Sequence, residues 1–124
     1  KIYAGEDEQI IQIALKESGP PNQICLHAQQ MAEKYLKGFL VYHKENPLKT
    51  HQLDKLLFEC QKYSKKFSQL TEEALLLSDY YIETRYPMHM VQFSRKEAKK
   101  AYSAAKKIKK TILQNLIFNK KTAR

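Results

Sequence analysis

The stretch Ile24-Cys-Leu-His27-Ala-Gln-Gln30-Met-Ala-Glu33-Lys34-Tyr-Leu-Lys37-Gly38 decides the fold class of this chain. An α-helix turns by about 100° per residue, so this spacing gathers the apolar residues on one side. These residues are Ile24, Ala28, Met31, Ala32, Tyr35, Phe39 and Tyr42. Another side carries His27, Gln30, Lys34 and Lys37, which we call the polar stripe. The stretch therefore predicts a helix with a core face and an ordered polar face.

The rest of the chain predicts four more helices and no strand. The five helices are expected over residues 6–17, 22–44, 51–63, from 71 to a point before Pro87, and from 95 onward. Thr50 and Thr71 are expected to cap the third and fourth helices, residues 65–68 to form a polar connector, and Ser94 and Glu97 to form a capping box. Short connections between helices favour an all-α, antiparallel up-and-down bundle of about five helices, four long and one short. We expect one domain over residues 1–124, with a frayed basic tail over 119–124.

Small residues in two of these helices predict the closest helix pair of the bundle. Ala28, Ala32 and Gly38 lie in the second helix, and Ala101, Ala104 and Ala105 lie in the last. Small side chains let two helix axes approach closely. If these helices pair, the lysine-rich face of the last helix is expected to adjoin the polar stripe.

Composition limits the class of protein. The 124 residues are 43% hydrophobic and 28% charged, which is typical of a globular domain. Cys25 and Cys60 lie in apolar segments without metal-ligand spacing, so we expect reduced core cysteines. No apolar run approaches the ~20 residues of a membrane span, and a cytoplasmic protein is expected. Because the sequence begins at Lys1 rather than at methionine, we leave open that residues precede it.

Positive charge is concentrated at one end of the chain. Residues 1–94 carry 11 Lys and Arg against 12 Asp and Glu, whereas residues 95–124 carry 11 against Glu97 alone. The net charges of the two parts are −1 and +10. Such asymmetry is typical of proteins that bind a polyanion, nucleic acid or nucleotide phosphate above all. A solvated face on a terminal helix is the alternative.

Arg85-Tyr86-Pro87 places a phosphate-binding side chain after the fourth helix, because the guanidinium of Arg85 forms a fork that fits phosphate. Tyr81 lies one turn earlier, so a ring and a guanidinium are offered together. Alternatively, Tyr86 and Pro87 form a packed corner and Arg85 pairs with a buried acid. His89 and Arg85 are candidate residues for metal-independent RNA cleavage, with His89 as general base.

Lys49 and His51 form a second candidate anion site. They precede the third helix, where free amides and the positive end of the helix dipole favour anions. His51 as a packing or capping residue is the alternative, and His27 has the same ambiguity. The sequence has no glycine-rich phosphate loop, no Cys and His residues at zinc-ligand spacing and no group of acidic residues that suggests two-metal catalysis. We therefore expect no metal and no cofactor.

Three blocks of this sequence resemble the HEPN (higher eukaryotes and prokaryotes nucleotide-binding) domain family. They are His27-Ala-Gln-Gln30-x-x-Glu33-Lys34-x-x-Lys37, Lys49-Thr50-His51-x-Leu53 and Arg85-Tyr86-Pro87. The resemblance extends from about residue 6 to 116 and implies a small stand-alone prokaryotic type: a bundle of about five helices, frequently a homodimer, often encoded beside a small nucleotidyltransferase. Members are either ribonucleases, typically toxin components of toxin–antitoxin pairs, or non-catalytic nucleotide- or partner-binding modules. The residues that the resemblance implicates are His27, Gln30, Lys34, Lys37, His51, Arg85 and Tyr86.

One departure favours the non-catalytic branch. Ribonuclease members place four to six residues between an Arg and a His, whereas three residues separate Arg85 from His89 here. Our leading hypothesis is a non-catalytic module that binds nucleotide or RNA phosphate, as a homodimer and accessory subunit of a nucleotidyltransferase. A ribonuclease that uses Arg85 and His89, and a pure protein-interaction domain, are the alternatives.

Overall fold

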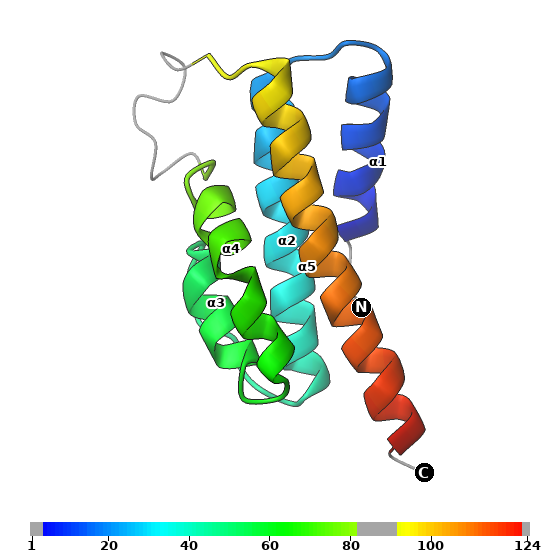
Figure 1. Ribbon diagram of the computed structural model, residues 1–124, viewed down its shortest axis with the longest axis vertical. Helices are drawn as coiled ribbons and strands as arrows, with labels where there is room; N and C mark the ends of the chain where they lie inside the picture. The colour runs from blue at the N-terminus through cyan, green and yellow to red at the C-terminus, as the bar shows by residue number, and fades with distance from the viewer. Residues whose placement is uncertain (1–3, 82–91, 123–124) are drawn as a thin grey trace.

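The computed structural model of the chain, which describes residues 4–81 and 92–122 and side chains as far as residue 116, is an all-α bundle (Figure 1). The long helices are α1 (Ala4–Lys16), α2 (Pro21–Tyr42) and α5 (Arg95–Thr122). Two helices of 8 residues each, α3 (Leu53–Cys60) and α4 (Thr71–Ser78), lie on the side of α2 away from α1. The all-α bundle is confirmed, with three long and two short helices in place of the expected four and one.

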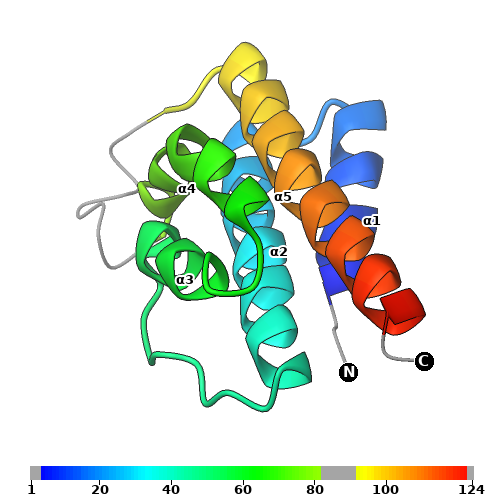
Figure 2. The ribbon, with the colours of Figure 1, turned by 60° about the horizontal axis from the view of Figure 1, so that its bottom comes forward.

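The directions of the helices depart from simple up-and-down order. Asn22 at the start of α2 accepts a hydrogen bond from the backbone N–H of Phe93, two residues before α5, at 2.8 Å. The two helices therefore begin at the same end of the bundle and run parallel, whereas α1 runs against both (Figures 1 and 2). Within the bundle, α1 and α2 are antiparallel, whereas α2 and α5 are parallel, because the short elements between α2 and α5 return the chain to its starting end.

The core lies around α2, as its apolar periodicity predicts. Among the described residues, α2 has the largest set of buried side chains near the centre of the bundle and contacts α1, α3, α4 and α5. Its most extensive contact is with α5. Ala28 and Ala32 on α2, and Ala101, Ala104 and Ala105 on α5, are at most 5% exposed. The structure thus confirms the close pairing of these two helices that the small residues predict.

Two of the expected helix caps are wrong. Thr50 Oγ1 accepts from the backbone N–H of Gln52, the N-cap residue of α3, and the first N–H of α3 is bound by the hydroxyl of Ser78 instead. Thr71 is the first residue of α4 and donates its hydroxyl to Ser68 O. Both corrections reflect side chains that bond locally within turns before the helix begins.

The connector and the helix ends also differ from expectation. Residues expected as a polar connector belong to a 3-10 helix, η1 (Lys65–Leu70), which is capped by the hydroxyl of Ser64. α4 ends at Ser78, before Tyr80 and Tyr81. α5 begins as predicted, with Ser94 Oγ accepting from the N–H of Glu97 at 3.0 Å, and it continues to Thr122.

The two cysteines are free and buried, as expected. Burial, together with the nearby carboxylates of Glu45 and Glu59, raises the pKa of the Cys60 thiol to about 12, so this thiol stays protonated and unreactive at neutral pH. None of the described helices combines the length and the hydropathy that crossing a bilayer requires.

The close approach of α2 and α5 leads to a test with Ala101→Leu. Ala101 is fully buried, and three added carbons force the two helices apart, so we expect a loss of about 1–3 kcal/mol in the free energy of unfolding. Urea denaturation measures it. The control Gln114→Leu adds a leucine at an exposed position of the same helix and is expected to change stability by less than about 0.5 kcal/mol. Equal effects of both variants would contradict the close pairing.

Candidate functional site

The polar stripe lies on the side of α2 that faces away from α5. Helical spacing places His27, Gln30, Lys34 and Lys37 opposite the small residues that pack toward α5. His27 and Lys34 bind Asp7 of α1. Gln30 and Lys37 bind Gln29 and Glu33 of α2 itself. Within residues 4–81 and 92–116, no hydrogen bond or ion pair joins α5 to the polar stripe. The expectation that the lysine-rich face of α5 adjoins the stripe is therefore wrong, because α2 stands between them.

A buried carboxylate of α1 holds one end of the stripe. The side chain of Asp7 is only 8% exposed. Its two oxygens bind two stripe residues, His27 through Nδ1 at 2.8 Å and Lys34 through Nζ at 2.7 Å. A carboxylate is stable in such a position only when donors surround it. Asp7 thus fixes the first turn of α1 against α2.

A second buried carboxylate, Glu33, holds the other end. Its side chain is 11% exposed and binds Lys37 Nζ at 3.0 Å and His51 Nδ1 at 2.9 Å. Gln29, fully buried, donates to the same carboxylate at 2.9 Å and accepts from Gln30 at 2.9 Å. Burial alone would raise the pKa of Glu33, but the hydrogen bonds from His51, Gln29 and Lys37 outweigh burial and hold that pKa below its usual value.

The segment before α3 completes the site through His51. The imidazole of His51 stacks on the ring of Tyr81, with centroids 3.7 Å apart and planes at 12°. The backbone carbonyl of His51 also lies 3.4 Å from the amide nitrogen of Gln29. His51 is therefore held by a carboxylate, an aromatic ring and a backbone contact, rather than by the end of α3.

The structure thus brings most of the candidate residues together. One surface, built from α1, α2, the segment before α3 and the residues that follow α4, carries six of them: His27, Gln30, Lys34, Lys37, His51 and Tyr81. Lys49 is exposed on the preceding loop. Arg85, Tyr86 and His89 lie outside the described residues. Tyr81, which we expected to act with Arg85, stacks on His51.

Sequence analysis missed the acceptors of this surface. Glu33 and Lys37 have the i,i+4 spacing of an ordinary surface ion pair. The pair exists, but Glu33 is buried and also holds His51. Asp7 and Gln29 carried no signal of their own in the sequence. An indirect signal is available: several boundary cations on one helix require acidic partners, and Asp7 lies in the neighbouring helix.

The two carboxylates of the site are more deeply buried than the four side chains that bind them. The Asp7 and Glu33 side chains are 8% and 11% exposed, whereas His27, Lys37, Lys34 and His51 are 24%, 30%, 39% and 41% exposed. Two ammoniums balance two carboxylates, so the site is formally neutral when both imidazoles are neutral. No group of three metal-ligating side chains occurs among the described residues.

A comparison with models of known protein families identifies the family of this chain. The model of the HEPN domain matches residues 4–116, nearly the whole chain. The chain belongs to the HEPN domain family. Neither the comparison with curated proteins nor that with solved structures returned a match. Membership associates this HEPN domain with nucleotides or RNA in general.

The lowered pKa of Glu33 makes stability depend on acid. Because the folded-state pKa lies below 4.5, the ionised carboxylate stabilises the fold above that pH, and its contribution is lost as the pH falls through the folded-state value. We expect Glu33→Gln to flatten the decline of the free energy of unfolding in acid, measured by urea denaturation at several pH values. The control Glu6→Gln, at an exposed position of α1, is expected to keep the wild-type decline. An unchanged decline in Glu33→Gln would contradict this assignment.

Proposed function

We propose that this HEPN domain is a non-catalytic module that binds the phosphate of a nucleotide or of RNA on the polar stripe and His51. One observation carries the proposal. Two buried carboxylates each hold one ammonium and one imidazole on the same exposed surface. A donor that is already oriented loses little freedom when a ligand arrives, and oriented donors favour oxyanions.

The donors retain capacity for a ligand. An ammonium has three N–H groups, and Lys34 and Lys37 each use one of them on a carboxylate. The rings of His27 and His51 bind their carboxylates through Nδ1, so Nε2 of a neutral ring accepts a hydrogen bond rather than donating one. A phosphate oxygen would therefore receive charge-assisted hydrogen bonds from the remaining N–H groups of Lys34 and Lys37, whereas each Nε2 can accept from a hydroxyl or N–H group of a nucleotide. Attraction depends on these bonds rather than on net charge, because two ammoniums balance two carboxylates.

The stacked pair of His51 and Tyr81 supports a nucleotide rather than free phosphate. The two rings lie beside the phosphate-facing donors, and aromatic surfaces are where nucleobases stack. Lys49, Arg85 and Tyr86 belong to the proposed site through the family resemblance. The segment with Arg85 and Tyr86 follows Tyr81 in the sequence.

The finer assignments are part of the same proposal. We propose a homodimer and a role as accessory subunit of a small nucleotidyltransferase, both on the family resemblance. The ribonuclease alternative rests on Arg85 and His89, and no described residue adds to it.

A second candidate function is favoured by exposed apolar side chains. Phe58 is 69% exposed and Ile13 is 63% exposed, and exposed apolar groups are typical of protein-interaction surfaces. A pure interaction domain would keep partner binding after Lys34→Ala, whereas a nucleotide-dependent module would not.

Titration calorimetry with a nucleotide panel at low salt tests the phosphate site. We expect Lys37→Ala to weaken nucleotide binding about tenfold or more, because a hydrogen bond to a charged group is worth about 1.5–3 kcal/mol. The control Lys55→Ala removes an exposed lysine of α3 and is expected to leave affinity unchanged. Absence of heat for every nucleotide with the wild-type protein would reject the proposal, and so would equal losses in both variants.

A further inference from the structure

The outer face of α5 carries cations that form no ion pair with a carboxylate of the described residues. Lys107 pairs with Glu73 at 3.4 Å and Lys109 with Glu8 at 2.6 Å. The other six described cations of α5 have no ion pair among residues 4–81 and 92–116. They are Arg95, Lys96, Lys99, Lys100, Lys106 and Lys110, which we call the α5 cation row. Arg95 donates to a backbone carbonyl, that of Leu15, and keeps its charge.

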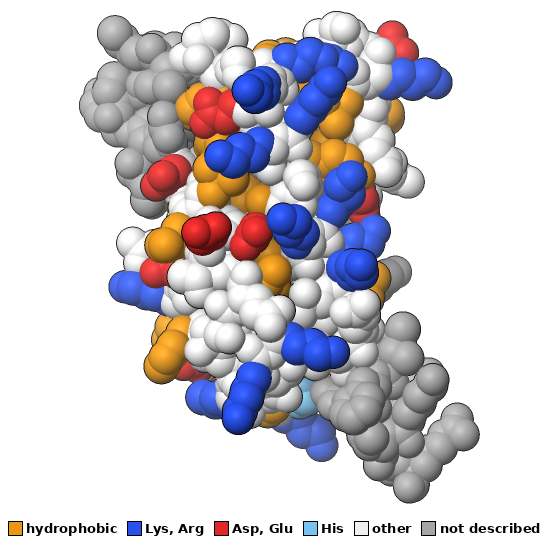
Figure 3. All heavy atoms as spheres, viewed as in Figure 1, with side chains coloured by type: hydrophobic (Ala, Val, Ile, Leu, Met, Phe, Trp, Pro, Cys, Tyr) orange, Lys and Arg blue, Asp and Glu red, His pale blue; other side chains and the backbone are white. Residues whose placement is uncertain are grey.

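Helical spacing aligns most of this row. Lys96, Lys99, Ser103, Lys106 and Lys110 follow one another at intervals of three, four, three and four residues, on the side opposite the buried Ala101 and Ala105. From Lys96 to Lys110 the rise of about 1.5 Å per residue gives a row about 21 Å long. Lysine and arginine side chains are spread over this face along α5 (Figure 3).

We infer that the α5 cation row binds a nucleic-acid backbone, on the face of the molecule opposite the polar stripe. A row of unneutralised charges of this length fits a linear polyanion, whose binding releases counterions. The inference goes beyond the phosphate site on the stripe and does not depend on it. A mononucleotide is too short to span the row, so the ligand must be an oligonucleotide.

The chemistry of the row predicts binding without sequence preference. Tyr102, the aromatic ring of α5 among the described side chains, is 9% exposed and lies under the ammonium of Lys106 at 4.4 Å, so it offers no surface for a base. An anionic membrane fits less well, because membrane-surface helices insert an apolar face, and that of α5 lies in the core. Recognition is therefore electrostatic and directed at phosphates.

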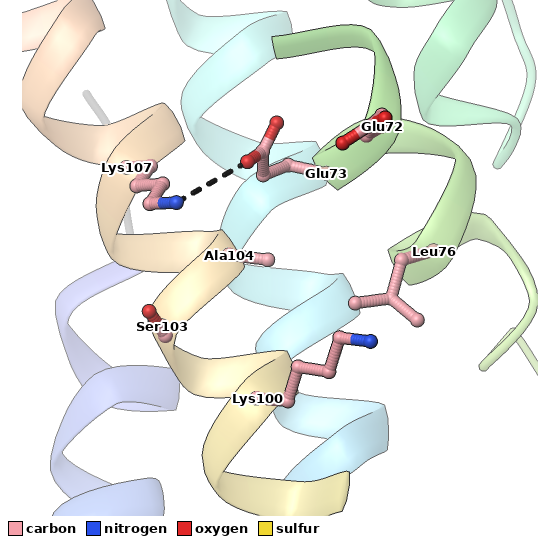
Figure 4. A pocket seen from close by; sticks show the side chains of 7 residues that line it. All are labelled: Glu72, Glu73, Leu76, Lys100, Ser103, Ala104 and Lys107. Carbon is pink, nitrogen blue, oxygen red and sulfur yellow. Dashed lines mark hydrogen bonds and ion pairs between the residues drawn. The ribbon is translucent and has the colours of Figure 1, made fainter.

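Acidic residues limit the row on one side. A groove of about 310 Å³ runs between α4 and α5, with Glu72, Glu73 and Leu76 on one wall and Lys100, Ser103 and Lys107 on the other (Figure 4). The carboxylate of Glu73 reaches across toward Lys107 and removes it from the row. Glu72 and Glu73 thus offset the charges of Lys100 and Lys107 in the groove, which favours phosphate on the outer side of α5.

Fluorescence anisotropy with a labelled 20-nucleotide RNA, from about 50 to 200 mM NaCl, tests the row. For single strands the slope of log K against log salt is about −0.7 for each phosphate contact, so six cations give about −4. We expect Lys99→Glu/Lys106→Glu/Lys110→Glu to weaken binding more than tenfold and to reduce the slope by about 2, while leaving mononucleotide affinity unchanged.

The matched control is Lys44→Glu/Lys55→Glu/Lys65→Glu. It changes net charge equally, at exposed positions on other elements, and is expected to keep the wild-type slope to within about one contact. Equal losses in the two triple variants, no RNA binding by the wild type, or binding to phosphatidylserine vesicles but not to RNA would each overturn the inference. Thermal unfolding shows whether each variant is folded. If the Lys→Glu triple variant of α5 is unfolded, Lys→Gln at the same three positions is measured in its place.

Glu73→Gln tests the boundary of the row with the opposite sign. Loss of the carboxylate frees Lys107 for phosphate and removes a repelling charge, so we expect RNA to bind a few-fold more tightly and the slope to steepen by about 0.7. The control Glu59→Gln removes a carboxylate that pairs with Lys62 away from α5 and is expected to leave both unchanged. Weaker RNA binding by Glu73→Gln would contradict the assigned path.

Discussion

The burial of two carboxylates beside α2 is the constraint on which the rest of this structure depends. A buried carboxylate needs donors on every side, and removal of one partner from such a pair costs about 3–5 kcal/mol. That is a large part of the 5–15 kcal/mol that stabilises a typical domain. Asp7 meets the need with two residues of α2, which docks α1, and Glu33 meets it with His51, which docks the segment before α3. The polar stripe is thus structural support and exposed surface together.

Two neighbouring carboxylates of α1 bind different helices, Asp7 binding α2 and Glu8 binding α5. Asp7 and Glu8 point about 100° apart on the helix, and Glu8 binds Tyr102 and Lys109 of α5, each at 2.6 Å. Burial alone would raise the pKa of Glu8, but these hydrogen bonds and the charge of Lys109 outweigh it and lower that pKa. One turn of α1 therefore links all three long helices.

The resulting faces differ in the kind of attraction that they offer. On the stripe, carboxylates beneath the surface balance the cations and orient their N–H groups, which favours short-range hydrogen bonding to a phosphate. On α5, most cations lack carboxylate partners in the described part of the chain, which favours long-range attraction that salt weakens. Residues 95–124 carry the net charge of +10 behind the chain's +9, and none of their described cations bonds to the polar stripe.

The sequence by itself determined the helices, the core face of α2, the close pairing of α2 with α5 and the cap at Ser94. Each of these depends on spacings of three or four residues or on residue size, which are local properties. It also identified His27, Gln30, Lys34, Lys37 and His51 as one group through the family pattern. Only the tertiary structure decided that Asp7 and Glu33 lie beneath them, that His51 stacks on Tyr81, and that α2 separates the stripe from the lysines of α5. The reason is physical: periodicity tells which side of a helix is buried, but the partner of a buried charge depends on which other helix, distant in the sequence, packs against that side.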